Sequence, residues 1–285
     1  MSKIFNYKKF QILHQDNAIV VVYKPSGMLS VPYEGSHEKT AIDTLETIMR
    51  KNGTWKNSHK PYAVHRLDKE TSGVMVFALS EPVKEKLMNN WHKDVTERIY
   101  IAVAETPKNK RDYIEKEGTI DLPLAQNAYH LSYVPKTHDP SIKTENARTH
   151  YKILNSNSDY SIFELQLDTG RKNQIRAHLS YMKYTLAGDK NYHSKTNPFG
   201  RLCLHAKSLA FIHPVNGKEV KFEVGAPVEW YKLLEEKSSS AKSTAPRKFA
   251  HKNSSKQNLE QMQKNFVSNK KLRGMDFIQR GQKSH

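Results

Sequence analysis

The sequence predicts an α+β fold in which helices flank a mixed, mostly antiparallel sheet. Segments of strand length, either wholly apolar or alternating between apolar and polar, recur through residues 1–230, and few helical patterns separate them. A parallel βαβ sheet would need a helix between successive strands. The turn sequence HPVNG also joins two predicted strands directly, as in a β-hairpin.

The first half of the chain supplies two long strands and two helices. Residues 18–23 and 74–79 are apolar on both faces, which is typical of strands buried within a sheet. Thr40 is placed to cap a helix that ends near Lys51, just ahead of a glycine. Ser80 is placed to cap a second helix, which carries a proline in its first turn.

The second half supplies the remaining strands. Residues 98–103 and 161–167 are predicted strands, and residues 202–212 and 217–224 form the hairpin around HPVNG. An apolar helical pattern follows the sequence DTG after the second of these strands. Residues 108–146 have no clear period, and we expect irregular or hairpin-like structure there.

We expect one folded domain over residues 1–236 and a disordered basic tail over residues 237–285. The boundary follows the helical sequence EWYKLLEEK. The tail holds 12 Lys or Arg against 2 Asp or Glu and is otherwise rich in Ser, Asn and Gln. Such a segment cannot bury enough apolar surface to offset the entropy of ordering it. A short helix is expected within it, where Leu259, Met262 and Phe266 fall on one face.

The charge of the chain predicts a polyanionic partner. Lys and Arg number 46 and Asp and Glu number 29, a formal net charge of +17. Nucleic acid is a better match for this excess than an acidic membrane surface, and solubility is the alternative reason for it. The charge does not reside in the tail alone, because residues 1–236 carry a net charge of +7.

Several classes of protein are excluded by composition. The sequence has no run of the ~20 apolar residues that a membrane helix needs, and the opening MSKIFNYKKF lacks the apolar core of a signal peptide. Cys203 is the single cysteine, so neither a disulfide framework nor a zinc site built from cysteines is possible. We expect a cytoplasmic protein.

The first polar cluster that interrupts the apolar pattern is the segment from His65 to Gly73. It leads directly into a buried strand, so a carboxylate at Asp68 would be held beside a rigid element and could act as a nucleophile or a general base. The alternative is a solvated turn in which Asp68 pairs with Arg66 or Lys69.

The second polar cluster is the sequence TGRKNQIR. Arg171 and Lys172 stand where a helix should begin, although the helix dipole disfavours cations at that end. Their presence indicates a site that binds an anion such as phosphate, and Arg176 could point toward Asp68. A surface basic patch is the alternative. Tyr100 is a third candidate, although an isolated tyrosine on a strand is usually a packing residue.

Other chemistry has less support. The 14 histidines show no spacing typical of metal ligands, and His205 and His213 are more easily explained as structural or RNA-facing. No glycine-rich loop for a nucleotide cofactor and no serine-hydrolase motif is present. We therefore expect neither a metal nor a cofactor.

These clusters resemble the motifs of RluA-type RNA pseudouridine synthases. HRLDKETSGVMVFA is similar to the family pattern HRLDxxTSG, and DNAIVVVYKPSGMLSVP to its opening strand and KPxG turn. RIYIAV, TGRKNQIRAHL, AGDKNYH and LHAKSLAFIHP are similar to further family motifs. The chain departs from the usual residues at Arg98, at Lys172 and Asn173, and at His193.

The resemblance implies a mechanism and a set of site residues. Pseudouridine formation cuts the N1–C1′ bond of uridine, turns the base and rejoins it through C5, so it needs no cofactor. Asp68 would be the essential carboxylate, Arg176 would keep it ionised and Tyr100 would stack on the base. The target would be flipped out of its helix, with Arg66 filling the space. The residues expected to bind substrate are His65, Arg66, Arg171, Lys172, Gln174 and His205.

We therefore expect a monomeric RNA pseudouridine synthase that acts on structured RNA, either rRNA or tRNA. No S4-type RNA-binding domain precedes the expected catalytic part, so the basic tail is a candidate substitute for it. A non-catalytic RNA-binding or RNA-chaperone protein with the same fold is the alternative, but it would not need an ionised aspartate among cations. A metal-dependent nuclease is disfavoured, because no cluster of carboxylates is present.

Overall fold

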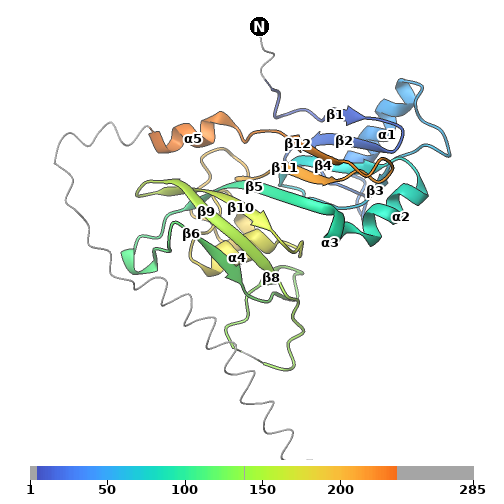
Figure 1. The fold of residues 1–285 in the computed structure, drawn as a ribbon. Helices are drawn as coiled ribbons and strands as arrows, with labels where there is room; N and C mark the ends of the chain where they lie inside the picture. Colours follow the sequence, from blue (N-terminus) through green and yellow to red (C-terminus); the bar gives the residue numbers. More distant parts are fainter. Residues whose placement is uncertain (1–4, 138, 236–285) are drawn as a thin grey trace, which may run out of the picture.

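The computed structural model describes residues 5–137 and 139–235, which fold around one large sheet (Figure 1). The strands are β1 (Gln11–Gln15), β2 (Ile19–Lys24), β3 (Tyr62–Ala63), β4 (Ser72–Ala78), β5 (Val95–Glu105), β6 (Glu117–Asp121), β7 (Ala125–Gln126), β8 (Ser132–Tyr133), β9 (Arg148–Ser156), β10 (Tyr160–Leu167), β11 (Leu204–Ile212) and β12 (Glu219–Glu223). The helices are α1 (Ala41–Lys51), α2 (Glu81–Asn89), α3 (Trp91–Asp94), α4 (Gln174–Tyr181) and α5 (Val228–Glu235), with 3-10 turns at Lys110–Asp112 and Lys190–Tyr192. No helix in these ranges is long and apolar enough to cross a membrane.

The sheet is mixed and mostly antiparallel, which confirms the predicted fold class. Its main path runs β1-β2-β4-β11-β5-β10-β9-β6, with β12 added beside β11 and β3 beside β4. Each of these pairs is antiparallel except that of β4 with β11. Strands from the beginning and the end of the domain therefore meet at the centre of the sheet.

The parallel pair depends on a glycine. Gly73 pairs with Ala206 and has a φ of +133°, which side chains rarely allow. A Cβ atom at this position would lie 2.2 Å from the carbonyl oxygen of Ala206. The close approach of β4 and β11 therefore requires the absence of a side chain.

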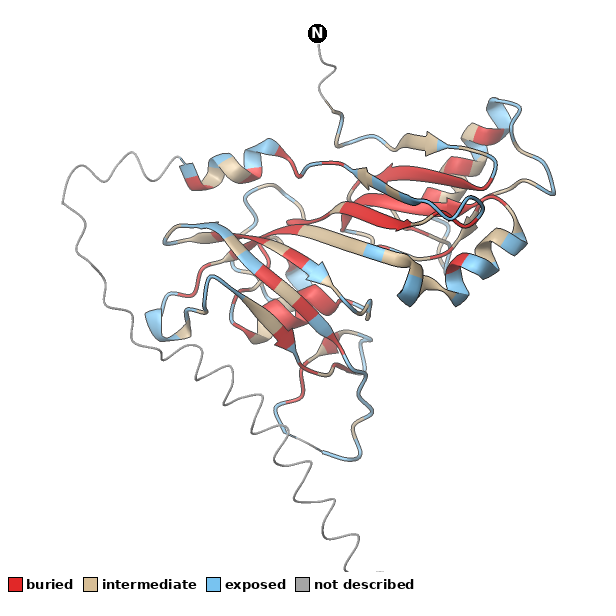
Figure 2. Ribbon diagram, in the orientation of Figure 1, coloured by how far each residue is buried: buried red, intermediate tan, exposed pale blue. Residues whose placement is uncertain are grey.

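Helices cover both faces of the sheet, and the alternation of the strands decides which face each one covers. Along β4, Met75 packs with residues of α1, whereas Val74 and Val76 pack with Leu87 of α2. Because successive side chains of a strand point to opposite faces, α1 and α2 lie on opposite sides of the sheet. Figure 2 shows β2 and β4 buried along their whole length, as their continuous apolar sequences predict.

The second half of the sheet is covered in the same way. Phe163 and Leu165 of β10 pack with apolar residues of α4, whereas Ile162 packs with Trp230 of α5. The two helices therefore lie on opposite faces, and α4 is held rigidly at the end of its strand. This arrangement places the polar sequence TGRKNQIR, which joins β10 to α4, at one edge of the core.

The helix predictions are confirmed with one difference. The side chain of Thr40 accepts a hydrogen bond from the backbone N–H of Asp43, and the Asp43 carboxylate accepts one from the N–H of Thr40, so α1 begins with a capping box. Ser80 precedes α2 but forms no such side-chain bond. The predicted tail, its short helix and the domain boundary at 236 lie outside the described residues.

Candidate active site

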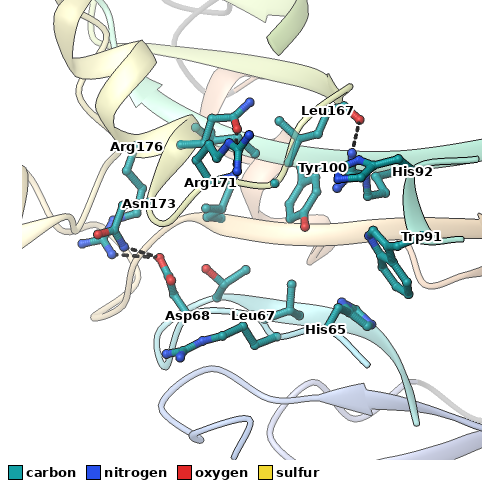
Figure 3. Close-up of a pocket in the computed structure, with 17 residues that line it drawn as sticks. His65, Leu67, Asp68, Trp91, His92, Tyr100, Leu167, Arg171, Asn173 and Arg176 are labelled. Atoms are coloured by element: carbon teal, nitrogen blue, oxygen red, sulfur yellow. Dashed lines mark hydrogen bonds and ion pairs between the residues drawn. The ribbon is translucent and has the colours of Figure 1, made fainter. Parts of the chain in front are cut away.

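A cavity of about 320 Å³ lies between the loop before β4, strand β5 and the residues that begin α4 (Figure 3). Three side chains predicted to be catalytic line it. Asp68 comes from the loop, Tyr100 from β5 and Arg176 from α4. Segments far apart in the sequence are therefore brought to one place by the central strands.

Two donors bind the same oxygen of Asp68. Nδ2 of Asn173 donates to Oδ2 at 2.7 Å, and Nη1 of Arg176 donates to it at 3.0 Å (Figure 3). The Asn173 amide must present its nitrogen here, because an ionised carboxylate can only accept. None of the described residues donates to Oδ1, and the Asp68 side chain is 25% exposed. One oxygen is fixed and the other is left unbonded.

Arg176 is itself held by a second carboxylate. Its Nε and Nη2 donate to the two oxygens of Asp189, each at 2.8 Å, and its guanidinium lies 5.1 Å from the ring centre of Tyr192. The side chain of Asp189 is 1% exposed. Burial alone would lower the pKa of Arg176, but its bonds to Asp189 and Asp68 raise it. The guanidinium is therefore a permanent cation that joins two aspartates.

A buried lysine fixes the loop that carries Asp68. Lys24, at the end of β2, is fully buried, and its Nζ donates to the carbonyl oxygens of Pro25, Met28 and Lys69 at 2.6 to 3.1 Å. Burial lowers the pKa of this ammonium to about 7. Ser30 adds two bonds to the backbone of the residue before Asp68. The turn after β2 and the Asp68 loop therefore form one rigid unit.

Aromatic rings form the other wall of the cavity. Burial raises the pKa of Tyr100 to about 12, so its hydroxyl stays protonated at neutral pH. The ring of His65 stacks on Trp91 with centres 4.8 Å apart, and its Nε2 accepts a hydrogen bond from the backbone N–H of Val76. Burial and the nearby Arg98 lower the pKa of His65 to about 3, so its single proton lies on Nδ1.

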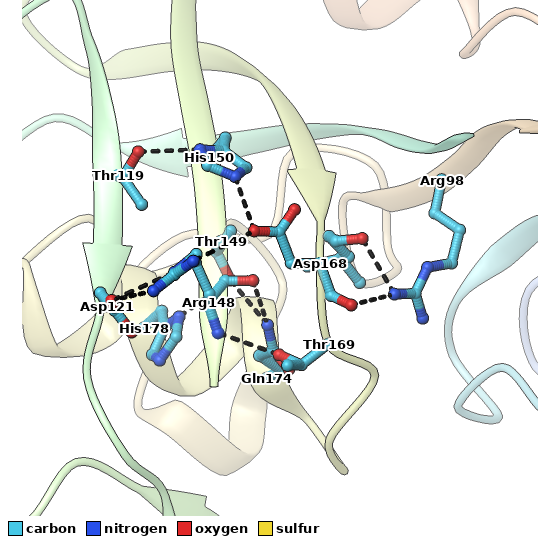
Figure 4. Close-up of polar contacts among 11 residues, drawn as sticks. Arg98, Thr119, Asp121, Arg148, Thr149, His150, Asp168, Thr169, Gln174 and His178 are labelled. Carbon is cyan, nitrogen blue, oxygen red and sulfur yellow. Dashed lines mark hydrogen bonds and ion pairs between the residues drawn. The ribbon is translucent and has the colours of Figure 1, made fainter. Parts of the chain in front are cut away.

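The residues before α4 are braced by Gln174 (Figure 4). Its Oε1 accepts from the Thr169 hydroxyl and the backbone N–H of Arg171, and its Nε2 donates to the Arg148 carbonyl and the Thr149 hydroxyl. All four hydrogen-bonding positions of the amide are used. Asn173 lies between these braced residues and Gln174, and its backbone is in the left-handed region with a φ of 51°. The strained turn aims its side chain at Asp68.

A known protein family accounts for these features. The model of the family described as RNA pseudouridylate synthase matches residues 18–181, more than half of the chain. The chain belongs to this family. Members are isomerases that act on RNA, which confirms the family resemblance and the enzyme class predicted from the sequence.

Relatives extend the similarity beyond the matched segment. The chain is 34% identical over 225 residues to the uncharacterized RNA pseudouridine synthase YlyB of Bacillus subtilis, covering 79% of this chain and 71% of that protein. It is 30% identical over 234 residues to the ribosomal large subunit pseudouridine synthase D of Zymomonas mobilis, with the same coverage of 79% and 71%.

Solved structures agree with the fold. The human RNA pseudouridylate synthase domain containing 4 superposes with a TM-score of 0.62 at 23% identity, covering 79% of this chain and 91% of that one. The human RNA pseudouridylate synthase domain containing 1 gives 0.60 at 18% identity, covering 79% and 86%. At these identities the likeness extends to the fold alone.

Of the residues expected to bind substrate in this pseudouridine synthase, two lie away from the cavity and a third lines it with its polar atoms already bonded. His205 is fully buried: its Nδ1 bonds to the Ser72 hydroxyl and its Nε2 to the Val224 carbonyl, because β11 carries it into the core. Lys172 is exposed and does not line the cavity. Gln174 lines it, but with every polar position used it braces the turn instead.

The other expected residues lie at the cavity of this pseudouridine synthase. His65, Arg66 and Arg171 all line it. Arg171 and Lys172 precede α4, which begins at Gln174, so the predicted conflict between two cations and a helix dipole does not arise. Within the described residues, no group of three or more His, Cys, Asp or Glu could hold a metal ion.

Sequence reasoning missed Asn173 and Asp189, which complete the site of this pseudouridine synthase. Asn173 was visible only as a departure from the residue usual in the family motif. Asp189 is a single acid in AGDKNYH, a loop sequence with no period. A buried acid needs a cation close by, so the expected inward direction of Arg176, toward Asp68, was the one available signal for it.

Proposed function

We propose that this enzyme isomerises a uridine of structured RNA in the cavity, with Asp68 as the essential carboxylate. The observation that carries the proposal is the carboxylate beside the cavity, with Oδ2 bound by Arg176 and Asn173 and Oδ1 unbonded within the described chain. The two donors fix the direction of the carboxylate. Oδ1 is then the oxygen that acts on the nucleotide.

The reaction needs only groups that the cavity supplies. The N1–C1′ bond of uridine breaks, the base turns and C5 bonds to C1′; the proton at C5 leaves and N1 gains one, so product and substrate are isomers. Oδ1 of Asp68 can add to C1′, add to C6 or remove a sugar proton, and each route uses the same fixed oxygen. The protonated hydroxyl of Tyr100 makes it a stacking group rather than a base at neutral pH.

A uridine within a helix cannot reach Asp68, so we propose that it is flipped out of the stack. Arg66 is exposed at the rim of the cavity and forms no side-chain bond to the described residues, which suits a side chain that fills the vacated space. His65 has a neutral ring whose Nδ1–H is left to donate, because the amide of Val76 uses Nε2. Arg171, which lies 3.7 Å from a carboxylate oxygen of Glu145, supplies a further cation to the cavity lining.

Large-subunit rRNA is the substrate we favour over tRNA. A relative of this chain is named a ribosomal large subunit pseudouridine synthase, and the net charge of +17 suits a large polyanion. Mapping pseudouridines in total RNA from cells with and without the gene distinguishes the two. Loss of a tRNA site with all rRNA sites retained would overturn this choice.

The role of Asp68 is tested by Asp68→Asn, which keeps the volume of the side chain and removes its charge. Release of tritium from RNA that contains 5-tritiated uridine reports the reaction. We expect turnover to vanish while RNA binding persists. Asp121→Asn is the matched control, because Asp121 pairs with Arg148 on the surface and lines no part of the cavity. Activity of Asp68→Asn within about tenfold of the wild type, or ~1.4 kcal/mol of barrier, would refute the assignment of Asp68 as the essential carboxylate.

We propose that residues 237–285 add affinity without choosing the target. Their 12 basic residues favour counterion release, which is independent of sequence and falls with salt. Removal of the segment is expected to weaken RNA binding and flatten its salt dependence, with turnover at saturating RNA unchanged. A change in the modified uridine would show instead that the segment selects the substrate.

A further inference from the structure

A second cavity of about 300 Å³ adjoins the first and takes no part in the mechanism described above. Arg176 lines both cavities, so the second one lies beside the guanidinium that binds Asp68. Its other walls are the loops between α4 and β11, together with Glu70 from the Asp68 loop. The second cavity is therefore within reach of an RNA strand whose uridine enters the first.

The second cavity contains a guanidinium without a counter-ion. Arg201 is half-buried, and it donates from Nε to the Leu202 carbonyl and from Nη2 to the Ser72 hydroxyl and the Leu204 carbonyl. Among the described residues it forms no ion pair with a carboxylate, although it also bonds to the side chain of Tyr23 and lies 5.4 Å from the ring centre of Trp230. Burial lowers the pKa of Arg201, which reflects the cost of this charge. Buried charges in proteins are normally paired.

The remaining charges of the second cavity also favour an anion. Arg176 and Asp189 are already bound to each other, which leaves Arg201 and Lys190 against the single carboxylate of Glu70. The amides of Asn191 and Asn197 line the rim and can donate hydrogen bonds. An oxyanion with two or more acceptor oxygens would supply the negative charge that this guanidinium lacks and could also accept hydrogen bonds from these amides.

We propose that the second cavity binds a backbone phosphate of the RNA strand next to the target uridine, with Arg201 as its main contact. This inference rests on the proposed function, because the phosphate belongs to the strand that delivers the uridine to Asp68. Arg201 then acts as a binding residue that sets the path of the strand past the active site. Glu70 opposes the phosphate and limits how tightly the strand is held.

The test measures binding of a synthetic RNA stem-loop with one uridine in its loop, at several salt concentrations. Asn197→Asp adds a negative charge at the rim without touching Arg201 and is expected to weaken binding about fivefold. Arg201→Gln is expected to weaken it about tenfold and to reduce the slope of log K against log salt by about 0.9. Glu70→Gln is expected to tighten it. The matched control is Asn155→Asp, at an exposed asparagine that lines neither cavity.

Neutral linkages locate the phosphate. A methylphosphonate placed at each linkage around the loop uridine in turn should weaken binding to the wild type at one position, and that position should have no further effect in Arg201→Gln. Arg201 also donates a hydrogen bond to Ser72, so thermal unfolding measures whether Arg201→Gln is folded. If Arg201→Gln does not fold, Asn197→Asp and Glu70→Gln still test the proposal.

The outcomes separate this inference from the proposed function. Binding by Asn197→Asp and Arg201→Gln equal to that of Asn155→Asp would overturn the phosphate site, whether or not the enzyme turns over. If a neutral linkage weakens binding to Arg201→Gln as much as it weakens binding to the wild type, the phosphate site is overturned as well. A wild type that shows the expected binding pattern but releases no tritium would refute the proposed chemistry and leave the phosphate site standing.

Discussion

Replacing Asp189 by asparagine tests whether the second carboxylate positions the active site. Asp189 is 1% exposed and accepts two charge-assisted hydrogen bonds of 2.8 Å from Arg176. Removal of one partner from a buried ion pair costs roughly 3–5 kcal/mol. In Asp189→Asn the amide oxygen can still accept one bond, but the NH2 group faces an N–H of the guanidinium. We therefore expect a loss of ~3 kcal/mol in the free energy of unfolding.

The same substitution should slow the reaction. Arg176 that is no longer held by Asp189 can turn toward solvent, and Asp68 then loses a donor from Oδ2. We expect kcat for tritium release to fall by at least tenfold, ~1.4 kcal/mol, with little change in the affinity for RNA. Urea denaturation measures the stability. Asp121→Asn is the control, because its pair with Arg148 is about half exposed and should be worth ~1 kcal/mol or less.

Two results would refute this reasoning. Equal losses of stability in Asp189→Asn and Asp121→Asn would mean that burial does not strengthen the inner pair. A destabilised Asp189→Asn with unchanged kcat would mean that Asp189 supports the fold and does not position Arg176.

Three further predictions concern other parts of the molecule. Gly73→Ala should lower the free energy of unfolding by more than ~3 kcal/mol, because its Cβ would lie 2.2 Å from the Ala206 carbonyl oxygen. Gly217→Ala, at a φ of +68° with open space around it, should lower it by ~1 kcal/mol. Urea denaturation measures both. Burial lowers the pKa of Lys24 to about 7, so above that pH the unfolded chain binds more protons than the folded one. The free energy of unfolding should therefore rise between pH 7 and 9. A curve that is flat or falls relative to that of Lys24→Met would contradict this. Tyr100→Phe should keep kcat within about tenfold of the wild type if Tyr100 only stacks, and a larger fall in tritium release would assign its hydroxyl to proton transfer.

Much of the sheet could be predicted from the sequence because its central strands are apolar on both faces. Residues 18–23 and 74–79 were expected as buried strands and correspond to β2 and β4. The cap at Thr40 was also predictable, since it depends on residues three positions apart. Residues 108–146 were expected to be irregular or hairpin-like, and β7 and β8 do pair with each other there. β6 was not found, because it is short and its partner β9 lies outside this segment.

Site residues whose role follows from their own side-chain chemistry could be predicted from the sequence. Residues whose role depends on where the fold places them could not. Asp68 and Arg176 were expected to meet, and they lie 3.0 Å apart. His205 was expected to bind substrate because its motif resembles that of the family, with a structural role as the alternative, and pairing of β11 with β4 buries it. Asn173 depends on a left-handed turn, and Asp189 on a distant arginine, neither of which a local pattern reveals.

The parallel pairing of β4 with β11 also decides when the enzyme becomes active during its synthesis. The Asp68 loop leads into β4, whose Ser72 meets His205, 133 residues later in the chain. At ~5–20 residues per second, roughly 7–27 s separate the synthesis of these two partners. During that interval the Ser72 end of one edge of β4 lacks its partner, because β3 pairs only with Phe77 and Ala78. Contacts of such long sequence separation form slowly. A nascent chain therefore carries Asp68 early but has no active site until the last strands of the sheet have left the ribosome.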